Sequence, residues 1–236
     1  MIKVHRSDQR GRADYGWLQA NYSFSFAQYY DPQRLGFRSL RVLNEDHILG
    51  GGGFPSHSHR DMEILTYIID GTLEHVDSMG NREVIEAGEF QMMSAGTGVV
   101  HSEANASQTE PLHLFQIWIE PATQGLDPGY KQMRLDGVRN ELRPVVVPTG
   151  DRREQQLENV MHIHQDVKIF SGQIDAGETF SYQTDPTRGA WIQVAKGTIE
   201  LNGERLEQGD GCEVHDEVEL QFMGATDAEF LLFDLS

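Results

Sequence analysis

One strand–turn–strand pattern occurs twice in this chain of 236 residues, and the repeat limits the fold more than any other feature of the sequence. Residues 64–74 have the pattern of a strand, a turn at Gly71 and a second strand that begins Thr-Leu-Glu. Residues 190–200 repeat this order, with Gly197 at the turn and Thr-Ile-Glu after it. Because each copy of an internal repeat folds as one structural unit, the sequence predicts two similar domains.

The segments on either side of these turns have the composition of β-strands. Residues 63–69 and 111–119 are rich in β-branched and aromatic side chains, which favour extended structure. The dipeptides Asp70-Gly71 and Gly80-Asn81 supply residues that adopt the positive φ angles of tight hairpins. No long segment has apolar residues at helical spacing. We therefore expect an antiparallel all-β protein.

A polar stretch near the middle of the chain interrupts the strand pattern. It contains Pro144 and Pro148, and proline in such a stretch favours turns and linkers over strands. We therefore divide the chain into a first domain over residues 1–133, a linker over residues 134–155 and a second domain over residues 156–236.

Charge and cysteine content limit the partners and the compartment. The chain has 37 acidic and 19 basic residues, and its net charge of −18 repels nucleic-acid phosphates and anionic lipid. We therefore expect no direct nucleic-acid contact, and the short apolar runs predict no membrane span. The single cysteine, Cys212, cannot form an internal disulfide and is interpreted as a small core residue. Together with an N-terminal segment that lacks a secretory signal, this favours a cytoplasmic protein.

Two pairs of residues have the spacing of metal ligands on extended strands. His57 and His59 are two positions apart, as are His101 and Glu103. Side chains at i and i+2 of a strand point to the same side, so each pair can present two donor groups to one ion. Three neutral imidazoles and one carboxylate suit Fe, Mn, Ni, Co or Zn, and the absence of thiolates argues against a structural zinc site. The sequence predicts one metal centre with coordination positions left open for substrate and O₂.

Two other groups of residues have a simpler interpretation. His162 and His164 have the same spacing but no His-x-Glu pair follows them, so we interpret them as residues on a strand surface. Four aromatic residues could line a pocket at the metal centre, but aromatic side chains on strands more often belong to the core. They are Phe54, Phe90, Phe115 and Trp118.

The segments that carry the two ligand pairs resemble the two sequence motifs of cupin domains. Residues 51–71 resemble the first motif, with one extra residue before its final glycine. Residues 88–105 resemble the second, with Ser94 where a proline is usual and four residues between Gly96 and His101. These departures are shared with the pirin family. Further pirin-like segments are residues 22–31, 36–37, 40–44, 59–67, 77–81 and 94–98.

The resemblance to pirins is dense over residues 1–120 and thin beyond. It implies a bicupin, that is, two cupin-type antiparallel β-sandwich domains of the double-stranded β-helix kind. It also implies one divalent metal ion in the first domain, with Fe(II) favoured and Mn, Ni, Co, Cu or Zn as alternatives, and it excludes Glu63 as a ligand. The implied ligands are His57, His59, His101 and Glu103, the same set that the spacing predicts.

The second repeat lacks a comparable set of ligands. Counting back from Gly197 by the intervals of the first motif reaches Gln183 and Asp185, and counting forward from Gly209 by the interval of the second reaches Phe222. We therefore expect a C-terminal domain without metal that supports and partly covers the first.

The resemblance also implies an activity, because several bacterial pirins act as quercetin 2,3-dioxygenases. A flavonol would bind the metal through its 3-hydroxyl oxygen, Glu103 would accept the hydroxyl proton as the catalytic base, and cleavage with O₂ would release carbon monoxide. Two alternatives stay open. One is a metal- or redox-responsive interaction protein with a protein partner, as for pirins linked to transcription regulation, and the other is a cupin enzyme with a different substrate.

Overall fold

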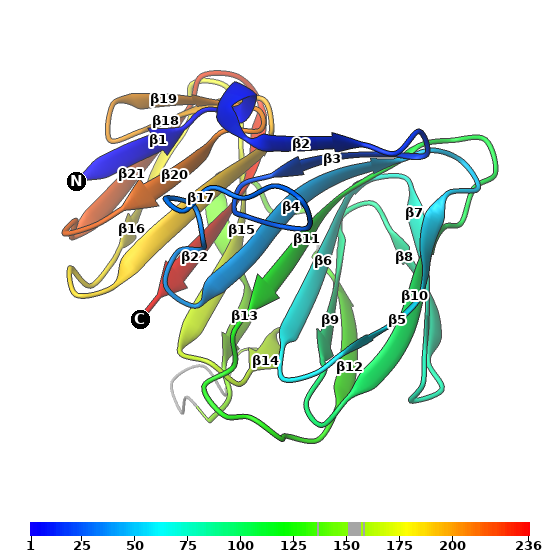
Figure 1. Ribbon diagram of the computed structural model, residues 1–236. Coiled ribbons are helices and arrows are strands. Elements are labelled where there is room, and N and C mark those ends of the chain that lie inside the picture. The colour runs from blue at the N-terminus through cyan, green and yellow to red at the C-terminus, as the bar shows by residue number, and fades with distance from the viewer. Residues whose placement is uncertain (136, 151–156, 158) are drawn as a thin grey trace. The chain divides into compact units, whose positions relative to one another are not determined.

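The computed structural model describes residues 1–135, 137–150, 157 and 159–236. Over these residues the chain forms antiparallel strands β1 to β22 and one short 3₁₀ turn, η1 (Ser7–Gln9), with no α-helix among them (Figure 1). This confirms the all-β prediction. The described residues contain no helix with the length and apolar character to span a bilayer.

The chain divides into two compact units. The N-terminal unit comprises Gly11–Leu135 and Ile163–Gln165, and the C-terminal unit comprises Met1–Arg10, Asp136–His162 and Asp166–Ser236. Each unit contains one seven-stranded and one four-stranded sheet. The two copies that the repeat predicts are therefore two β-sandwiches of the same kind.

In the N-terminal unit the seven-stranded sheet has the order β12-β9-β6-β11-β4-β3-β2. Its strands are β2 (Gly11–Asp14), β3 (Leu18–Tyr22), β4 (Leu40–Ile48), β6 (Glu63–Asp70), β9 (Glu89–Ser94), β11 (Leu112–Ile119) and β12 (Gly129–Arg134). The four-stranded sheet has the order β5-β10-β7-β8. Its strands are β5 (Gly53–His59), β7 (Thr72–Asp77), β8 (Arg82–Glu86) and β10 (Val99–Asn105).

In the C-terminal unit the seven-stranded sheet has the order β1-β20-β17-β22-β15-β13-β14. Its strands are β1 (Ile2–His5), β13 (Glu141–Pro148), β14 (Met161–Ile163), β15 (Val167–Ile174), β17 (Gly189–Lys196), β20 (Gly211–Val214) and β22 (Ala228–Leu235). The four-stranded sheet has the order β16-β21-β18-β19. Its strands are β16 (Thr179–Gln183), β18 (Thr198–Leu201), β19 (Glu204–Glu207) and β21 (Glu219–Gly224).

Apolar side chains from both sheets of the N-terminal unit meet in its interior. Leu73 and Ile85 of the four-stranded sheet pack in one cluster with Ile68 and Leu114 of the seven-stranded sheet. Along β10, buried residues alternate with more exposed ones. Because successive side chains on a strand point to opposite faces, His101 and Glu103 both point into this interior.

The two units are divided at other residues than those predicted from the sequence. Strand β1 falls in the expected first domain, yet it pairs with β20 from Ile2 opposite Val214 to His5 opposite Gly211. Strand β13 falls in the expected linker. Its apolar run, residues 145–147, is fully buried, and the register shifts just after Pro144, where a proline can be accommodated. Residues 136 and 151–155 of the expected linker lie outside the described residues.

The two glycines of the repeat are required by close backbone contacts. Gly71 has φ of +87°, and a Cβ atom there would lie 2.6 Å from the backbone oxygen of Pro111. Gly197 has φ of +73°, and a Cβ atom would lie 2.1 Å from the backbone oxygen of Asp227. Because only glycine fits this combination, the same residue recurs in both copies.

Candidate metal centre

Strands β5 and β10 bring three histidines together inside the N-terminal unit. Their pairing places Val99 opposite His59 and His101 opposite His57. The ring centroids lie 4.8 Å apart for His57 and His59, 4.4 Å for His57 and His101, and 4.9 Å for His59 and His101. One ring nitrogen from each histidine lies within 4.8 Å of the others. The predicted convergence of the two short segments is therefore present.

The nitrogens of this cluster are arranged as ligands of one ion would be. Nδ1 of His57 lies 2.8 Å from the carbonyl oxygen of Pro55, which can only accept, so Nδ1 carries the hydrogen and Nε2 keeps its lone pair. Nε2 of His101 lies 3.0 Å from Nε2 of His57. Two nitrogens that each bind one ion at about 2.1 Å, at right angles, are about 3.0 Å apart. The pair therefore fits a shared cation.

Burial keeps the imidazoles of His59 and His101 in their neutral, ligating form. Burial and then the neighbouring His57 lower the pKa of His59 to about 4. Burial, followed by the charges of the neighbouring histidines, lowers the pKa of His101 to about 3. Because a metal ion competes with protons for the imidazole lone pair, both side chains are available to a cation at neutral pH.

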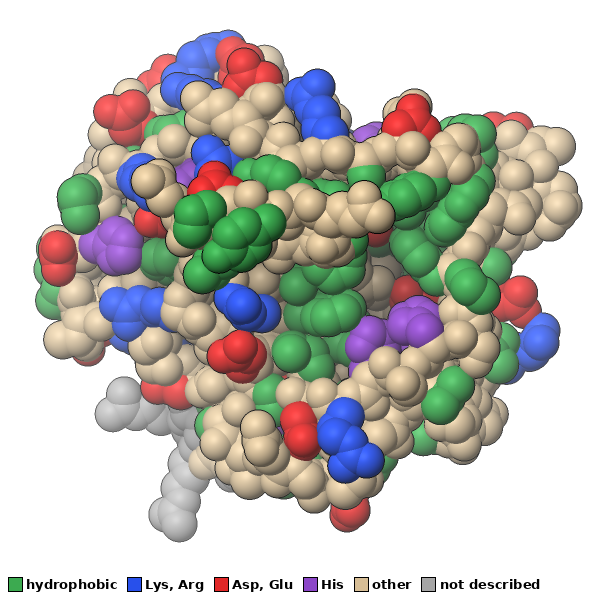
Figure 2. Space-filling model, viewed as in Figure 1, with side chains coloured by type: hydrophobic (Ala, Val, Ile, Leu, Met, Phe, Trp, Pro, Cys, Tyr) green, Lys and Arg blue, Asp and Glu red, His purple; other side chains and the backbone are tan. Residues whose placement is uncertain are grey.

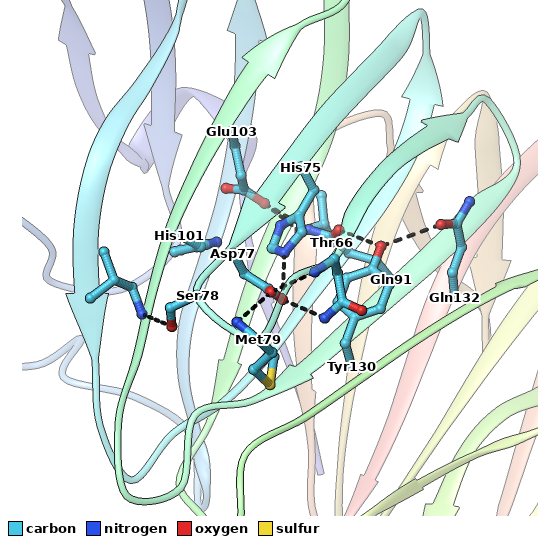
Figure 3. A network of polar contacts seen from close by, with 12 residues as sticks. Thr66, His75, Asp77, Ser78, Met79, Gln91, His101, Glu103, Tyr130 and Gln132 are labelled. Atoms are coloured by element: carbon cyan, nitrogen blue, oxygen red, sulfur yellow. Dashed lines mark hydrogen bonds and ion pairs between the residues drawn. The ribbon is translucent and has the colours of Figure 1, made fainter.

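Glu103 lies deeper in the same interior and is held by three polar side chains. Nε2 of Gln91 donates to Oε1 at 2.7 Å, and the hydroxyl of Thr66 is 3.4 Å from Oε1 (Figure 3). Nε2 of Gln116 donates to Oε2 at 3.0 Å. Burial raises the pKa of Glu103 against the opposing effect of nearby imidazoles and these amides. One carboxylate oxygen of Glu103 and one ring nitrogen each of His101 and His75 lie within 4.8 Å of one another.

The geometry agrees with comparisons to known proteins. The pirin family model matches residues 3–119, and a quercetinase C-terminal cupin domain matches residues 153–235. Quercetin 2,3-dioxygenase of Escherichia coli K12 is 46% identical over 235 residues, which cover 100% of this chain and 99% of that protein. This chain belongs to the pirin family. The predicted resemblance is confirmed.

Solved structures show the same relationship for this pirin. The crystal structure of YhhW from Escherichia coli has a TM-score of 0.94 and 45% identity, covering 100% of this chain and 98% of that one. A second structure of YhhW, in complex with nickel(II), has a TM-score of 0.93 and 44% identity, covering 100% and 99% of the two chains. The nickel belongs to YhhW, and it supports the interpretation of this pirin's histidine cluster as a metal centre.

Sequence spacing did not identify the polar residues around Glu103. Each of Thr66, Gln91 and Gln116 is a polar side chain between two apolar neighbours on its strand, and all three are buried. A buried polar residue needs a partner, so this pattern was the available signal. Tyr130 belongs to the same network, because its hydroxyl lies 3.2 Å from Oε1 of Gln91 (Figure 3).

The remaining candidates lie in different surroundings. Ser94 donates to Glu63 at 2.7 Å, and Nδ1 of His164 lies 3.1 Å from the same buried carboxylate. His164 is therefore a contact of Glu63 rather than a simple surface residue. Phe90 and Phe115 are fully buried in the core. Of the four aromatic candidates, Trp118 borders the histidine cluster, because its ring centroid lies 4.9 Å from that of His59.

The histidine cluster reaches the surface of the N-terminal unit. Figure 2 shows histidine side chains in a recess over β5 and β10, with hydrophobic side chains around it. Glu103 and His101, each 2% exposed, form the buried part of this site. The arrangement is a donor set that a small molecule could approach from one side.

The counterparts of the histidines in the C-terminal unit differ from those obtained by counting along the sequence. Phe222 pairs with Leu201, four residues after Gly197, as Glu103 pairs with His75, four residues after Gly71, so Phe222 corresponds to Glu103. Leu220 opposite Tyr182 then corresponds to His101 opposite His57. The counterpart of His57 is therefore Tyr182 rather than Gln183, and that of His101 is Leu220 rather than Phe222. The count from Gly197 is shifted because the connection after β5 spans residues 60–62, whereas the longer one after β16 spans 184–188.

Proposed function

We propose that this pirin is a metal-dependent dioxygenase that cleaves a flavonol such as quercetin with O₂ and releases carbon monoxide. The observation that carries the proposal is the convergence of three imidazoles beside a buried carboxylate in an open recess. The full-length relative named quercetin 2,3-dioxygenase supports the same activity. Fe(II) is the proposed ion, with Mn, Ni, Co, Cu and Zn as alternatives.

The proposed ligands are the two predicted pairs of side chains. The 3.0 Å approach of the Nε2 atoms of His57 and His101 and the low pKa values of His59 and His101 support this set. When bound, the ion supplies Lewis acidity and contact with O₂. The ligands are His57, His59, His101 and Glu103.

Glu103 is proposed as the catalytic base. The O–H bond of the flavonol 3-hydroxyl breaks, and its proton passes to a carboxylate oxygen of Glu103. Burial raises the pKa of this carboxyl, which makes it a better proton acceptor than an exposed glutamate. Gln91 and Gln116 hold the two oxygens in place, and Trp118 offers a flat apolar surface next to His59 for the substrate rings.

The test is turnover by the iron-loaded protein. We expect loss of quercetin and of O₂ together with release of carbon monoxide, measured by absorption, an oxygen electrode and gas analysis. Protein loaded in turn with Fe, Mn, Ni, Co and Cu that leaves the flavonol unchanged in every case would refute this activity.

We also propose that the protein is cytoplasmic and makes no direct contact with nucleic acid. The net charge of −18 supports the second point. Cys212 is a buried free cysteine, and burial raises its pKa to about 12, so its thiol is poorly suited to disulfide exchange.

A further inference from the structure

His75 is a histidine next to the cluster that spacing did not predict. It lies on β7, directly opposite Glu103 of β10. Its side chain is fully buried, its ring centroid is 5.2 Å from that of His101, and it stacks on Tyr130 at 4.9 Å. Figure 3 shows His75 between Glu103 and Asp77. The buried end of the site therefore contains a fourth imidazole.

Asp77 fixes which nitrogen of His75 carries the hydrogen. Its Oδ1 accepts from the backbone N–H groups of Met79 and Asn81, and its Oδ2 accepts from the side-chain amide of Asn81 at 2.7 Å. Nε2 of His75 lies 3.2 Å from the same Oδ2. Because a carboxylate held by N–H donors can only accept, Nε2 carries the hydrogen and Nδ1 keeps a lone pair. Metal-binding histidines have this arrangement, with the far nitrogen donating to a carboxylate.

Two imidazole nitrogens at this end of the site have no hydrogen-bond partner. They are Nδ1 of His75 and Nδ1 of His101, in side chains that are at most 2% exposed. Buried polar atoms without a partner are uncommon, and an ion that they bind is one explanation. One donor atom each from His75, His101 and Glu103 lies within 4.8 Å of the others. The chemistry of this group, two imidazoles and a carboxylate, suits a divalent transition metal.

We propose that His75, His101 and Glu103 form an inner position for the metal ion. The inference rests on the proposed metal-dependent function, and it adds His75 as a ligand. His101 belongs to this inner group and also to the outer group with His57 and His59, and its two ring nitrogens allow it to serve either. The inner group is fully buried, whereas the outer group opens to the recess. An ion at the inner position is shielded from solvent and is held without His57 and His59, so the inner position is separate from the four-ligand position of the proposed function.

The double variant His57→Ala/His59→Ala separates the two positions. Both residues lie on β5, the edge strand of the four-stranded sheet, so their truncation leaves the buried group intact. Metal-free protein is titrated with Co(II), and the bound ion is measured by elemental analysis and by its visible absorption. We expect the double variant to keep one Co(II) per chain, and a triple variant with His75→Phe to lose it.

Two further variants control for folding and for histidine content. Asp77→Asn in the double-variant background leaves His75 in place and is expected to weaken Co(II) binding by about 10- to 100-fold. It tests the same ligand if His75→Phe does not fold, as judged by circular dichroism. His162→Ala in that background removes a histidine that belongs to neither group and should leave binding unchanged.

The outcomes distinguish the inner position from the proposed function. Wild type that binds Co(II) beside a double variant that binds none refutes the inner position alone. A triple variant that binds as tightly as the double variant refutes it as well. Wild type that binds no Co(II), Ni(II) or Fe(II) refutes the metal-dependent function itself.

Discussion

The two units share a strand order but differ in the chemistry of their interiors. The sheets β12-β9-β6-β11-β4-β3-β2 and β5-β10-β7-β8 of the N-terminal unit correspond strand by strand to β1-β20-β17-β22-β15-β13-β14 and β16-β21-β18-β19 of the C-terminal unit. Where the first unit pairs His101 with His57, the second pairs Leu220 with Tyr182. Leu220 is buried in an apolar cluster that includes Phe222 and Phe230. One fold therefore holds either a cluster of imidazoles or a cluster of apolar side chains.

The side chains that hold Glu103 show the same exchange. Phe222 takes the place of Glu103, because it pairs with Leu201 as Glu103 pairs with His75, so the C-terminal unit has no carboxylate there. Apolar residues replace the three polar partners of that carboxylate at matching positions in the register. Thr66, Gln91 and Gln116 correspond to Ile192, Cys212 and Leu232.

The comparison teaches that the polar interior is not needed for folding. A buried polar group costs free energy unless it is fully paired, and the C-terminal unit forms the same sheets with apolar residues instead. The polar groups of the N-terminal unit are therefore best explained by function, since sites are added to folds that do not require them.

The largest effect is expected from giving the N-terminal unit the residue of its counterpart. His101→Leu removes the imidazole that both groups of ligands share, so we expect metal affinity to fall at least ~100-fold and dioxygenase activity to be lost. The apoprotein should stay folded, because leucine fits the equivalent place in the other unit, where it is Leu220. Elemental analysis after gel filtration measures the ion, and full occupancy of this variant would contradict the ligand assignment.

Glu103→Gln separates catalysis from metal binding. The amide keeps the shape of the carboxyl but cannot accept a proton as a base, so we expect activity to fall by about 10²- to 10⁴-fold. Metal content should fall less, since the histidines remain. Steady-state rates corrected for bound metal measure the difference. Equal loss of activity and of metal would assign Glu103 to binding alone.

The reverse exchange tests the C-terminal unit. Leu232→Gln introduces the counterpart of Gln116 where no carboxylate can accept its hydrogen bonds, so we expect the free energy of unfolding to fall by about 2 to 4 kcal/mol. Chemical denaturation of the metal-free protein measures it. Leu114→Gln is a matched change in the N-terminal unit, also on the inner face. A variant at Leu232 as stable as wild type would show that this interior tolerates unpaired amides.

A smaller effect concerns the pairing of β1 with β20 in the C-terminal unit. Nε2 of His5 lies 2.7 Å from Oε1 of Glu213. This contact lowers the pKa of Glu213 from 4.5 to about 2. Lys3 and His215 also lower the pKa, whereas burial raises it. A depressed carboxyl pKa stabilises the folded state above the unfolded value, and the stabilisation is lost as pH falls from 4.5 towards 2.

Glu213→Gln should therefore lower the free energy of unfolding by about 1 kcal/mol at pH 6, and the difference from wild type should vanish near pH 2. Thermal unfolding across this range measures both. A difference that persists unchanged at low pH would show that the carboxylate charge is not its cause.

The fold class and three of the clustered histidines could be predicted because they depend on local geometry. Side chains two positions apart on a strand share a face whatever the strand pairs with, so the spacing of His57 and His59 was sufficient. The glycine turns were equally local, as the positive φ of Gly71 shows.

The rest depends on which strands become neighbours. Gln91, Gln116 and His75 reach Glu103 from β9, β11 and β7, and that arrangement is set by long-range register rather than by spacing in the sequence. The place of β1 was missed for the same reason. Four residues with an alternating pattern do not specify which sheet edge they join.

The pairing of residues 2–5 with residues 211–214 has a consequence for synthesis on the ribosome. The strand that completes one edge of the C-terminal sheet leaves the exit tunnel long before its neighbour has been translated. The N-terminal unit can close in the meantime, but the early strand stays unpaired until the last part of the message is read. Assembly of the C-terminal unit is thus tied to the end of translation, and a C-terminal half expressed alone would carry an open sheet edge that invites aggregation.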